Sequence, residues 1–407
     1  MTQIDHAWGA GPSPQYEPLA ATFRPLFAKI AARAVARDLE HALPHDEIRW
    51  LREAGFSRLR LPRDKGGLGA SLPELFALLI ELGAADSNVV NALRAHLGFT
   101  EDVLTSAHAE WRDPWLRRLA EDELIGSGFS ETGDAKVSAF STRLTRKGES
   151  LRLDGAKFYT TGSLFADWIN VGATNVDDES VLLTVPRSAR GVAVADDWEG
   201  FGQSLTASGT ATFEDVEVDP AWLNPSKTRF PYSSGFYQLV HLATLAGIGR
   251  AQSDNLAQLV RERERVYSHG NGDRASLDPQ VLQVAGKVRA AAYGAGAIVV
   301  QAATALQRVY DAQLSGDADA TVKATTIAGV EVDQAVSVVT HLILDASTLL
   351  FDALGASAVK RSQGLDRYWR NARTISSHNP RIYRERQVGD YAVNGVAPPT
   401  FYRVGAR

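Results

Sequence analysis

The sequence of 407 residues contains no cysteine, and its single methionine is Met1. The absence of cysteine excludes disulfide bonds, thiolate catalysis and cysteine-based metal sites. Ordinary usage would give a chain of this length on the order of eight internal methionines, which leucine can replace in a core at small cost. Two interpretations stay open: drift in a GC-rich coding background, or selection for a protein that is made when sulfur is scarce.

The chain also lacks a strong charge of either sign and long apolar runs. Its net charge of −5 gives no reason to expect nucleic acid or an anionic membrane surface as a partner. Charged residues interrupt each apolar run that approaches the length of a bilayer span. The N-terminal segment shows no basic stretch followed by an apolar core, so no secretory signal is visible. We therefore expect a cytoplasmic protein that binds neither nucleic acid nor membrane.

The patterns that are present divide the chain into helical, β and helical zones. Apolar residues recur at three- and four-residue spacing in the first and last zones, and period-two runs rich in β-branched residues fill the middle one. Short strands without intervening helices favour an antiparallel barrel or sandwich, and long Ala-rich helices suit a four-helix bundle. The predicted divisions of this α+β chain are an arm at 1–15, a helical domain at 16–122, a β domain at 123–228 and a helical bundle at 229–407.

The sequence contains no clear motif for binding a nucleotide phosphate or a metal ion. The segments AGIGRAQ (246–252) and YGAGAI (293–298) lie inside helical patterns and lack a third glycine, so neither fits a dinucleotide-binding loop. We interpret both as positions where helices pack closely. The nine histidines are scattered, and no His/Asp/Glu pair recurs at helical spacing, so no metal site is predicted.

Two polar loops and two histidines are the remaining candidates. The segments GFSETGD (128–134) and KFYTTG (157–162) offer hydroxyls and backbone amides that can bind an anion or a heteroaromatic ring, although they can equally be turns. His96, in RAHLGF, has the pattern of a core histidine, and His378, in SSHNP, has that of a capping residue. The segment around His378 contains no carboxylate between Arg367 and Glu385.

The order of the zones, together with FSETGD, KFYTTG, ASGTATFEDVEV and RERERVYS, resembles the acyl-CoA dehydrogenase family over nearly the whole chain. The resemblance implies a helical domain, a central antiparallel β-barrel or sandwich domain and a C-terminal four-helix bundle that assembles as a homotetramer. In the dehydrogenases a Glu near the SSHNP turn removes the α-proton of an acyl thioester. His378 and Asn379 occupy that place here, and neither Asn379 nor Tyr237 is a base at neutral pH.

The segments DDWEGFGQSLTASGTATFEDVEV and DRYWRNARTISSHNPRIYRERQVGDYAVNG resemble the dibenzothiophene monooxygenases and related sulfur-acquisition oxidoreductases of the same fold. That resemblance implies the oxygenase component of a two-component monooxygenase. It would use FMN as FMNH2, delivered by a separate NAD(P)H-dependent flavin reductase, and O2, through a C4a-hydroperoxyflavin. The implied substrate is an organosulfur compound, such as a sulfone, a sulfoxide or a thiophene. Such chemistry needs a dry pocket and neutral hydrogen-bond donors, which fits the loss of the Glu.

The resemblance also assigns residues. His378 would hold the hydroperoxide, Thr161 would place a hydroxyl near flavin N5, and His96 would complete the catalytic set. The implied cofactor-binding residues are Phe129, Ser130, Glu131, Thr132, Tyr159, Thr160, Thr161, Trp198, Arg265 and Asn379. The aromatic residues expected to line an apolar pocket are Phe129, Tyr159, Phe165, Trp168 and Trp198.

Two departures from the monooxygenase pattern leave alternatives open. Ile375 stands where those enzymes have a second histidine, and Ser357 stands where they have an arginine that contacts phosphate. Lys360 or Arg361 are candidates to replace that contact. The alternatives are an acyl-CoA dehydrogenase with FAD, an amine N-hydroxylase of the same fold, and a flavin-free binding or scaffold protein.

Overall fold

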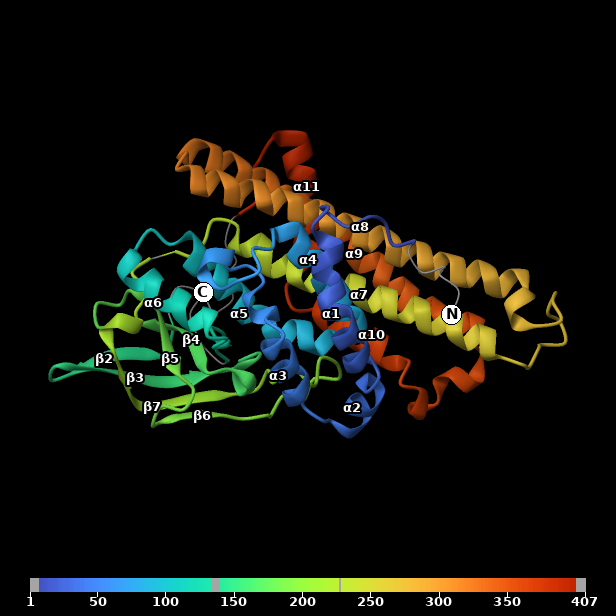
Figure 1. Cartoon of the computed structure of the whole chain (residues 1–407), viewed down its shortest axis with the longest axis horizontal. Coiled ribbons are helices and arrows are strands. Elements are labelled where there is room, and N and C mark those ends of the chain that lie inside the picture. The colour runs from blue at the N-terminus through green and yellow to red at the C-terminus, as the bar shows by residue number, and fades with distance from the viewer. Residues whose placement is uncertain (1–6, 133–139, 227, 400–407) are drawn as a thin grey trace.

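The computed structural model describes residues 7–132, 140–226 and 228–399. Figure 1 shows the sheet at one end of an elongated molecule, with helices of the N-terminal part against it and the long helices of the C-terminal part reaching the other end. The order of elements is helices, then strands, then helices, which is the acyl-CoA dehydrogenase-like fold that the sequence predicts.

Six α-helices make up the N-terminal part of the described chain. Leucine-rich α4 is largely buried, and it begins with a capping box in which the backbone N–H of Ser71 donates to Glu74 Oε2 over 2.7 Å. The helices are α1 (Tyr16–Ala31), α2 (Ala34–Glu40), α3 (His45–Glu53), α4 (Leu72–Ala85), α5 (Ser87–Thr105) and α6 (Ala109–Ala120).

In the middle of the chain the described residues form one seven-stranded sheet in the order β1-β4-β2-β3-β7-β6, with β5 paired to β4. Most pairs are antiparallel, as predicted, but β4 runs parallel to β1 and also to β2. Both parallel pairs join strands separated by long connections, which the alternation of residues along a strand does not reveal. The strands are β1 (Ile125–Gly128), β2 (Arg143–Lys147), β3 (Ser150–Lys157), β4 (Trp168–Thr174), β5 (Ser180–Pro186), β6 (Val192–Val194) and β7 (Ala211–Val218).

Within the described residues, the C-terminal part has three long α-helices and two short ones. Helices α7, α8 and α9 run side by side along the length of the molecule (Figure 1), α10 packs against α7 and α9, and α11 packs against α9. The helices are α7 (Ser233–Glu262), α8 (Pro279–Ser315), α9 (Ala318–Leu349), α10 (Asp366–Ser376) and α11 (Ile382–Asn394).

The two glycine segments differ in how closely their helices pack. A Cβ added at Gly247 would lie 2.5 Å from the backbone of Gly83, and one at Gly249 would lie 2.6 Å from Ile343, so the close-packing interpretation is confirmed for residues 246–252. The nearest atoms to a Cβ at Gly294 and at Gly296 are 3.7 and 3.6 Å away. Close packing therefore does not require glycine at these two positions, since a Cβ there would lie at ordinary van der Waals distance from its neighbours.

One helical stretch in the described residues, Ala318–Ala353, is long and apolar enough to cross a membrane by length and composition. The expectation that charges interrupt every such run was therefore wrong for this stretch. Half of its apolar window is buried inside the fold, where α9 packs against α7 and α8. A core helix of a bundle passes the same test, so this feature reflects packing between helices.

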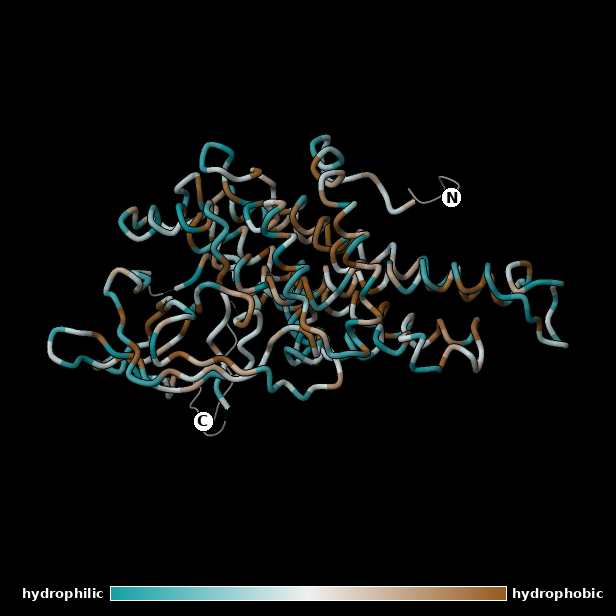
Figure 2. The backbone as a smooth tube through the Cα atoms, turned by 60° about the horizontal axis from the view of Figure 1, so that its bottom comes forward, coloured by the Kyte–Doolittle hydropathy of each residue, from teal (hydrophilic) through white to brown (hydrophobic). Residues whose placement is uncertain are grey.

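The apolar core is continuous across the first and last parts of the chain. One cluster joins α1, α4, α5, α7, α8 and α9, while a separate cluster lies against the sheet. Figure 2 shows hydrophobic residues concentrated in the central helices, with hydrophilic loops at both ends of the molecule. The two helical parts therefore fold as one body, and burial of apolar surface is its main driving force.

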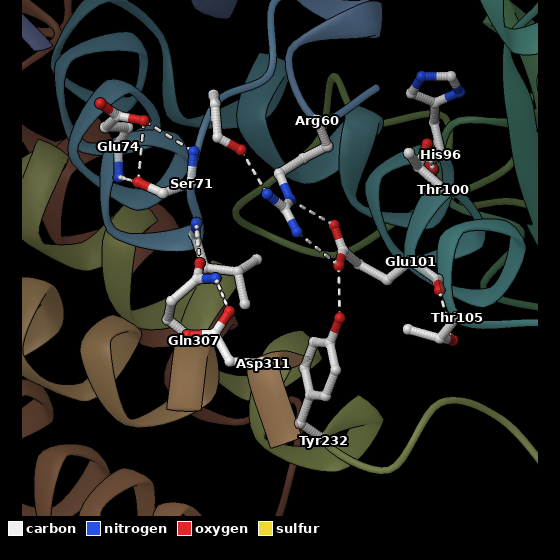
Figure 3. Close-up of polar contacts among 12 residues, drawn as sticks. Arg60, Ser71, Glu74, His96, Thr100, Glu101, Thr105, Tyr232, Gln307 and Asp311 are labelled. Atoms are coloured by element: carbon white, nitrogen blue, oxygen red, sulfur yellow. Dashed lines mark hydrogen bonds and ion pairs between the residues drawn. The ribbon is translucent and has the colours of Figure 1, made fainter. Parts of the chain in front are cut away.

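A buried polar network ties these parts together around Glu101 on α5 (Figure 3). Arg60 donates from Nε and Nη2 to the two carboxylate oxygens of Glu101, over 2.7 and 3.1 Å, and Tyr232 donates its hydroxyl to Oε2 over 2.5 Å. Arg60 precedes α4, and Tyr232 immediately precedes α7. Because Glu101 has no exposed surface, each of its oxygens depends on these donors.

We predict that Glu101→Gln lowers the free energy of unfolding by about 3–5 kcal/mol, because it leaves the buried guanidinium of Arg60 without a counter-charge. Urea denaturation followed by circular dichroism measures the change. The matched control is Glu110→Gln, at an exposed position in the first turn of α6, which should change stability by less than about 0.5 kcal/mol. Equal stabilities of the two variants would contradict the prediction.

Candidate active site

The loop after β3 presents one aromatic ring and one hydroxyl at the surface. Tyr159 has a left-handed backbone (φ 58°) and is 46% exposed, while Thr160 is buried and donates from N and Oγ1 to the carbonyl of Gly209, over 3.1 and 2.8 Å. Gly162 (φ 82°) lies against the carbonyl of Ala92 on α5, where a Cβ would collide. The side chain of Thr160 therefore anchors the loop, and Tyr159 and Thr161 remain for contact with a ligand.

Thr161 belongs to a chain of hydroxyl groups that the sequence did not reveal. Its Oγ1 lies 2.7 Å from Ser208 Oγ, which lies 2.6 Å from Thr206 Oγ1, and Thr206 donates to the carbonyl of Gln203 over 2.8 Å. Each hydroxyl has one proton to donate, and Thr206 donates to a carbonyl, so Ser208 donates to Thr206 and Thr161 donates to Ser208. The oxygen of Thr161 is therefore left to accept a hydrogen bond from a ligand. Ser208 lies in the segment ASGTATFEDVEV, and Thr206 directly precedes it. Their spacing alone does not indicate that they belong to a site.

An aromatic pair stands beside this loop. The ring of Trp198 lies 5.7 Å from that of Tyr159, and Trp198 Nε1 donates to the carbonyl of Gly202 over 3.2 Å. Two of the other rings expected to line a pocket are elsewhere: Phe165 packs against His45 at 4.9 Å, and Trp168 packs against Trp115 at 5.1 Å. That part of the prediction was wrong, because these two rings pack against other aromatic rings.

The loop after β1 contains an internal ion pair. Glu131 accepts from Lys157 Nζ over 2.5 Å and from the backbone and hydroxyl groups of Ser141 and Thr142. Although burial raises the pKa of Glu131, these hydrogen bonds outweigh it and lower the pKa to about 2. The side chain is therefore a structural anchor, which corrects the cofactor-binding role predicted for it.

For the neighbours of Glu131 the cofactor-binding role stays a prediction. The backbone N–H of Phe158 donates to the carbonyl of Ser130 over 2.9 Å, which joins this loop to the Tyr159 loop. Phe129 is half-buried and Thr132 is exposed. Gly133 and Asp134, which end the predicted motif, lie outside the described residues.

His378 lies just after α10 in contact with α5 and α7. Its ring is 4.4 Å from that of His241, its Nε2 is 3.4 Å from Arg94 Nη2, and its Nδ1 is 3.3 Å from Asn379 Oδ1. Because a guanidinium only donates, Nε2 accepts and the proton is assigned to Nδ1, which donates to Asn379. Asn379 in turn donates to Gln238 Oε1 over 2.9 Å.

The charge state of His378 follows from its surroundings. Burial of the imidazole and the positive charge of Arg94 lower the pKa of His378, although the residue as a whole is exposed. Burial, Arg94 and His378 also lower the pKa of His241. Both imidazoles are therefore neutral at physiological pH.

A cluster of side chains that the sequence analysis missed connects His378 to Phe129. The guanidinium groups of Arg94 and Arg229 each lie 4.9 Å from the ring of Tyr237, and that of Arg229 also lies 5.1 Å from the ring of Phe129. Asp102 accepts from Arg229 Nε over 2.9 Å. Burial raises the pKa of Tyr237 to about 12, so its hydroxyl stays protonated. Helical spacing was the signal that could have found Arg94. Arg94 and His96 are two residues apart on one helix, so they face different sides of α5 and only one of them can face this cluster.

His96 is not brought to this cluster. It stands two residues after Arg94, about 200° around the helix, and its Nε2 lies 2.9 Å from the carbonyl of Ser57. Burial lowers its pKa, so the neutral ring donates to that carbonyl. The catalytic assignment of His96 is thus corrected to that of a buried histidine between parts of the N-terminal domain, and Arg94 is the side chain of α5 that faces His378.

The predicted phosphate contact is also remote from the cluster. Arg265 is exposed and follows the end of α7, and its carbonyl accepts from Arg263 Nε over 3.1 Å. From His241 to Glu262, α7 rises about 1.5 Å per residue, which separates the two places by roughly 30 Å. Arg263 also donates to the carbonyl of Ala353 over 3.0 Å, so the segment that carries Ser357 lies at this same end of the helix.

The residues at the Thr161 and His378 end fit a planar heteroaromatic ligand such as a flavin ring. Tyr159 and Trp198 offer aromatic rings, and Thr161 offers a hydroxyl. Both ring nitrogens of His241 are buried without a hydrogen-bond partner among the described residues. Buried polar atoms of this kind normally have a partner, which a bound ligand can provide.

Comparison with known proteins defines the class. The model of the acyl-CoA dehydrogenase N-terminal domain matches residues 13–123, and that of the acyl-CoA dehydrogenase C-terminal domain matches residues 239–380, which together exceed half of the chain. The chain belongs to the acyl-CoA dehydrogenase family. Several relatives that match nearly the whole chain are named as monooxygenases, and the chain is an oxidoreductase of that branch.

The particular relatives are as follows. A dibenzothiophene monooxygenase of Rhodococcus erythropolis is 27% identical, with 93% of this chain and 94% of the relative covered. A probable FMNH2-dependent monooxygenase, SfnC, of Pseudomonas putida is 27% identical, with 95% and 97% covered. Among solved structures, FMN-bound TdsC of Paenibacillus sp. A11-2 has a TM-score of 0.84 at 25% identity, with 94% and 98% covered. Methanesulfinate monooxygenase MsuC of Pseudomonas fluorescens has the same score and identity, with 96% and 99% covered.

The Glu131–Lys157 pair gives a pH prediction. The pKa of Glu131 is about 2 in the fold against 4.5 for a free glutamate, so its contribution is complete above about pH 4.5 and is lost as the pH falls toward 2. Glu131→Gln should therefore lower stability by about 1–3 kcal/mol at pH 7 and by progressively less in acid.

Urea unfolding from pH 7 to pH 3 measures this difference. Glu149→Gln, at an exposed position in the turn between β2 and β3, is the matched control and should match the wild type throughout. A loss in the Glu131 variant that does not depend on pH would refute the assignment.

Proposed function

We propose that this chain is the oxygenase component of a two-component flavin monooxygenase that uses reduced FMN and O2. The observation that carries the proposal is the environment of His378, which occupies the place of the dehydrogenase base. Its neighbours are the neutral His241 and the cation of Arg94, and the carboxylate of the cluster, Asp102, is held by Arg229. Abstraction of a proton from an acyl thioester has no base in this arrangement.

Bound reduced FMN supplies the two electrons with which one oxygen atom of O2 enters the substrate and the other leaves as water. The protein supplies the surroundings. Tyr159, Trp198 and the Thr161 hydroxyl would hold the flavin ring, while Phe129 and Tyr237 would exclude water from the reacting side. With the proton of His378 on Nδ1, the donors nearest to that side are the guanidinium of Arg94 and the hydroxyl of Tyr237. This revises the role of His378 from donor to the residue that orients Arg94.

Two finer parts of the proposal rest on the relatives and on composition. A C4a-hydroperoxyflavin as the oxygen-transferring species follows from the requirement for a dry site with neutral or cationic donors. An organosulfur substrate is supported by the names of the relatives and by the absence of sulfur beyond Met1. A separate NAD(P)H-dependent flavin reductase would deliver the FMNH2.

We also propose a homotetramer. Arg265 lies too far along α7 to reach a flavin at His378 of its own chain, so its predicted phosphate contact would be made to a flavin in a neighbouring copy. Exposed apolar side chains on the long helices support such a contact: Tyr293, Leu314, Val322 and Val338. Light scattering that gives the mass of one 44.0 kDa chain would contradict it.

The central test compares two reactions on one preparation. FMNH2 and O2 with an organosulfur compound should give an oxygenated product, whereas anaerobic mixing of the oxidised flavoprotein with acyl-CoA thioesters should leave the flavin unbleached. Bleaching without oxygen would favour the dehydrogenase alternative. Failure to bind FMN or FAD in calorimetry would favour the flavin-free scaffold, and turnover of amines alone would favour the N-hydroxylase.

For His378→Ala we predict nearly unchanged FMN affinity, less product and more hydrogen peroxide per FMNH2 consumed. The reason is that Arg94 loses its acceptor and water gains access from the side that the imidazole covers. Product yield and peroxide are measured together under single turnover. His108→Ala, at an exposed position before α6, is the control. A wild-type ratio of product to peroxide in the His378 variant would remove this residue from the mechanism.

A further inference from the structure

Arg94 carries a positive charge for which the described residues provide no carboxylate within ion-pair distance. Its side chain is half-buried, and its Nε is fully buried without a hydrogen-bond partner among those residues. Its polar contact is Nη2 to His378 Nε2 at 3.4 Å, which is long for a hydrogen bond. Burial and the positive charge of Arg229 lower the pKa of Arg94 to about 10, and Tyr237 raises it in part. The guanidinium therefore stays charged at neutral pH.

Other arginines of the interior are matched by carboxylates, which makes Arg94 an exception within the described chain. Their pairs are Arg37 with Glu47 and Asp86, Arg60 with Glu101, Arg229 with Asp102 and Arg384 with Asp333. Arg250 also has an unpartnered Nε, but Glu81 and Asp254 act on it electrostatically. A partly desolvated cation without a counter-charge is costly, and proteins rarely keep one without a use for it.

The side chains around Arg94 leave further hydrogen-bonding capacity unused. Both ring nitrogens of His241 are buried without partners among the described residues, and its ring lies 4.4 Å from that of His378 at an interplanar angle of 54°. Tyr237 lies under the guanidinium. Arg229 adds a second cation that Asp102 balances, so this end of the site has an excess of positive charge. An incoming oxyanion would meet a cation and neutral imidazoles, and the carboxylate of Asp102 is already paired with Arg229.

We propose that the substrate of this site carries an oxyanion head group, as a sulfinate or a sulfonate does, and that Arg94 binds it. The proposal rests on the proposed monooxygenase function and narrows it. A guanidinium presents two parallel N–H groups that match two oxygens of such a head group. A neutral sulfone, sulfoxide or thiophene would leave the charge of Arg94 uncompensated, and it would gain little from this part of the site.

The test measures binding to the FMN-loaded protein by calorimetry, with methanesulfinate, methanesulfonate and the neutral dimethyl sulfone. The wild type should bind at least one of the two anions more than tenfold more tightly than the sulfone. Arg94→Gln should weaken anion binding roughly 10- to 100-fold, because a charge-assisted hydrogen bond is lost. Arg94→Lys should restore part of it, and affinity for the sulfone should change less than about threefold in both variants. Tighter binding of sulfinate than of sulfonate would identify sulfinate as the substrate form.

Arg250→Gln is the matched control, since Arg250 is also partly buried and stacks on an aromatic ring, that of Trp8, in another part of the molecule. It should leave all three affinities unchanged. Equal wild-type affinities for anions and sulfone, or an equal loss for both in Arg94→Gln, would overturn the proposal while leaving the monooxygenase function intact. A loss of FMN affinity in Arg94→Gln without substrate would assign the counter-charge to the flavin and also overturn it. Failure of the wild type to bind FMN would remove the proposed function and this inference together.

Discussion

The position of several segments around α5 depends on two adjacent carboxylates of that helix, Glu101 and Asp102. Glu101 binds Arg60, which precedes α4, and Tyr232, which immediately precedes α7. Asp102 binds Arg229, which belongs to the candidate site. Buried ion pairs are weak sources of net stability, but removing one partner leaves an uncompensated charge. The network therefore acts mainly by excluding other arrangements of these segments.

Helix α5 places both halves of the site. The carbonyl of Ala92 lies against Gly162, in the loop that carries Thr161, and Arg94 contacts His378 directly. Because residues two apart on a helix point in nearly opposite directions, His96 faces the N-terminal domain while Arg94 faces the bundle. The site is thus formed where one helix meets the sheet loops and α7, and its geometry depends on α5 being held by Glu101 and Asp102.

The electrostatics of this place separate two chemistries available to the fold. A dehydrogenase needs an ionised carboxylate beside the substrate, whereas this chain has neutral imidazoles at His241 and His378 and the cation of Arg94. Such an environment stabilises negative charge as it develops and does not remove a proton from carbon. The depressed pKa values of the two histidines reflect burial and the positive charge of Arg94, for which the described residues provide no carboxylate within ion-pair distance.

The sequence alone determined the helical, β and helical order, because residue periodicity reflects which face of each element is buried. It also determined that the segment around His378 has no carboxylate between Arg367 and Glu385, since that is a matter of local composition. Only the tertiary structure decided that Glu131 and Thr160 serve as anchors, that Arg265 lies far from His378 and that Arg94, rather than His96, faces His378. The reason is that these outcomes depend on partners remote in the chain, such as Arg94 and His378, which are 284 residues apart. Local periodicity carries no information about which distant side chains meet.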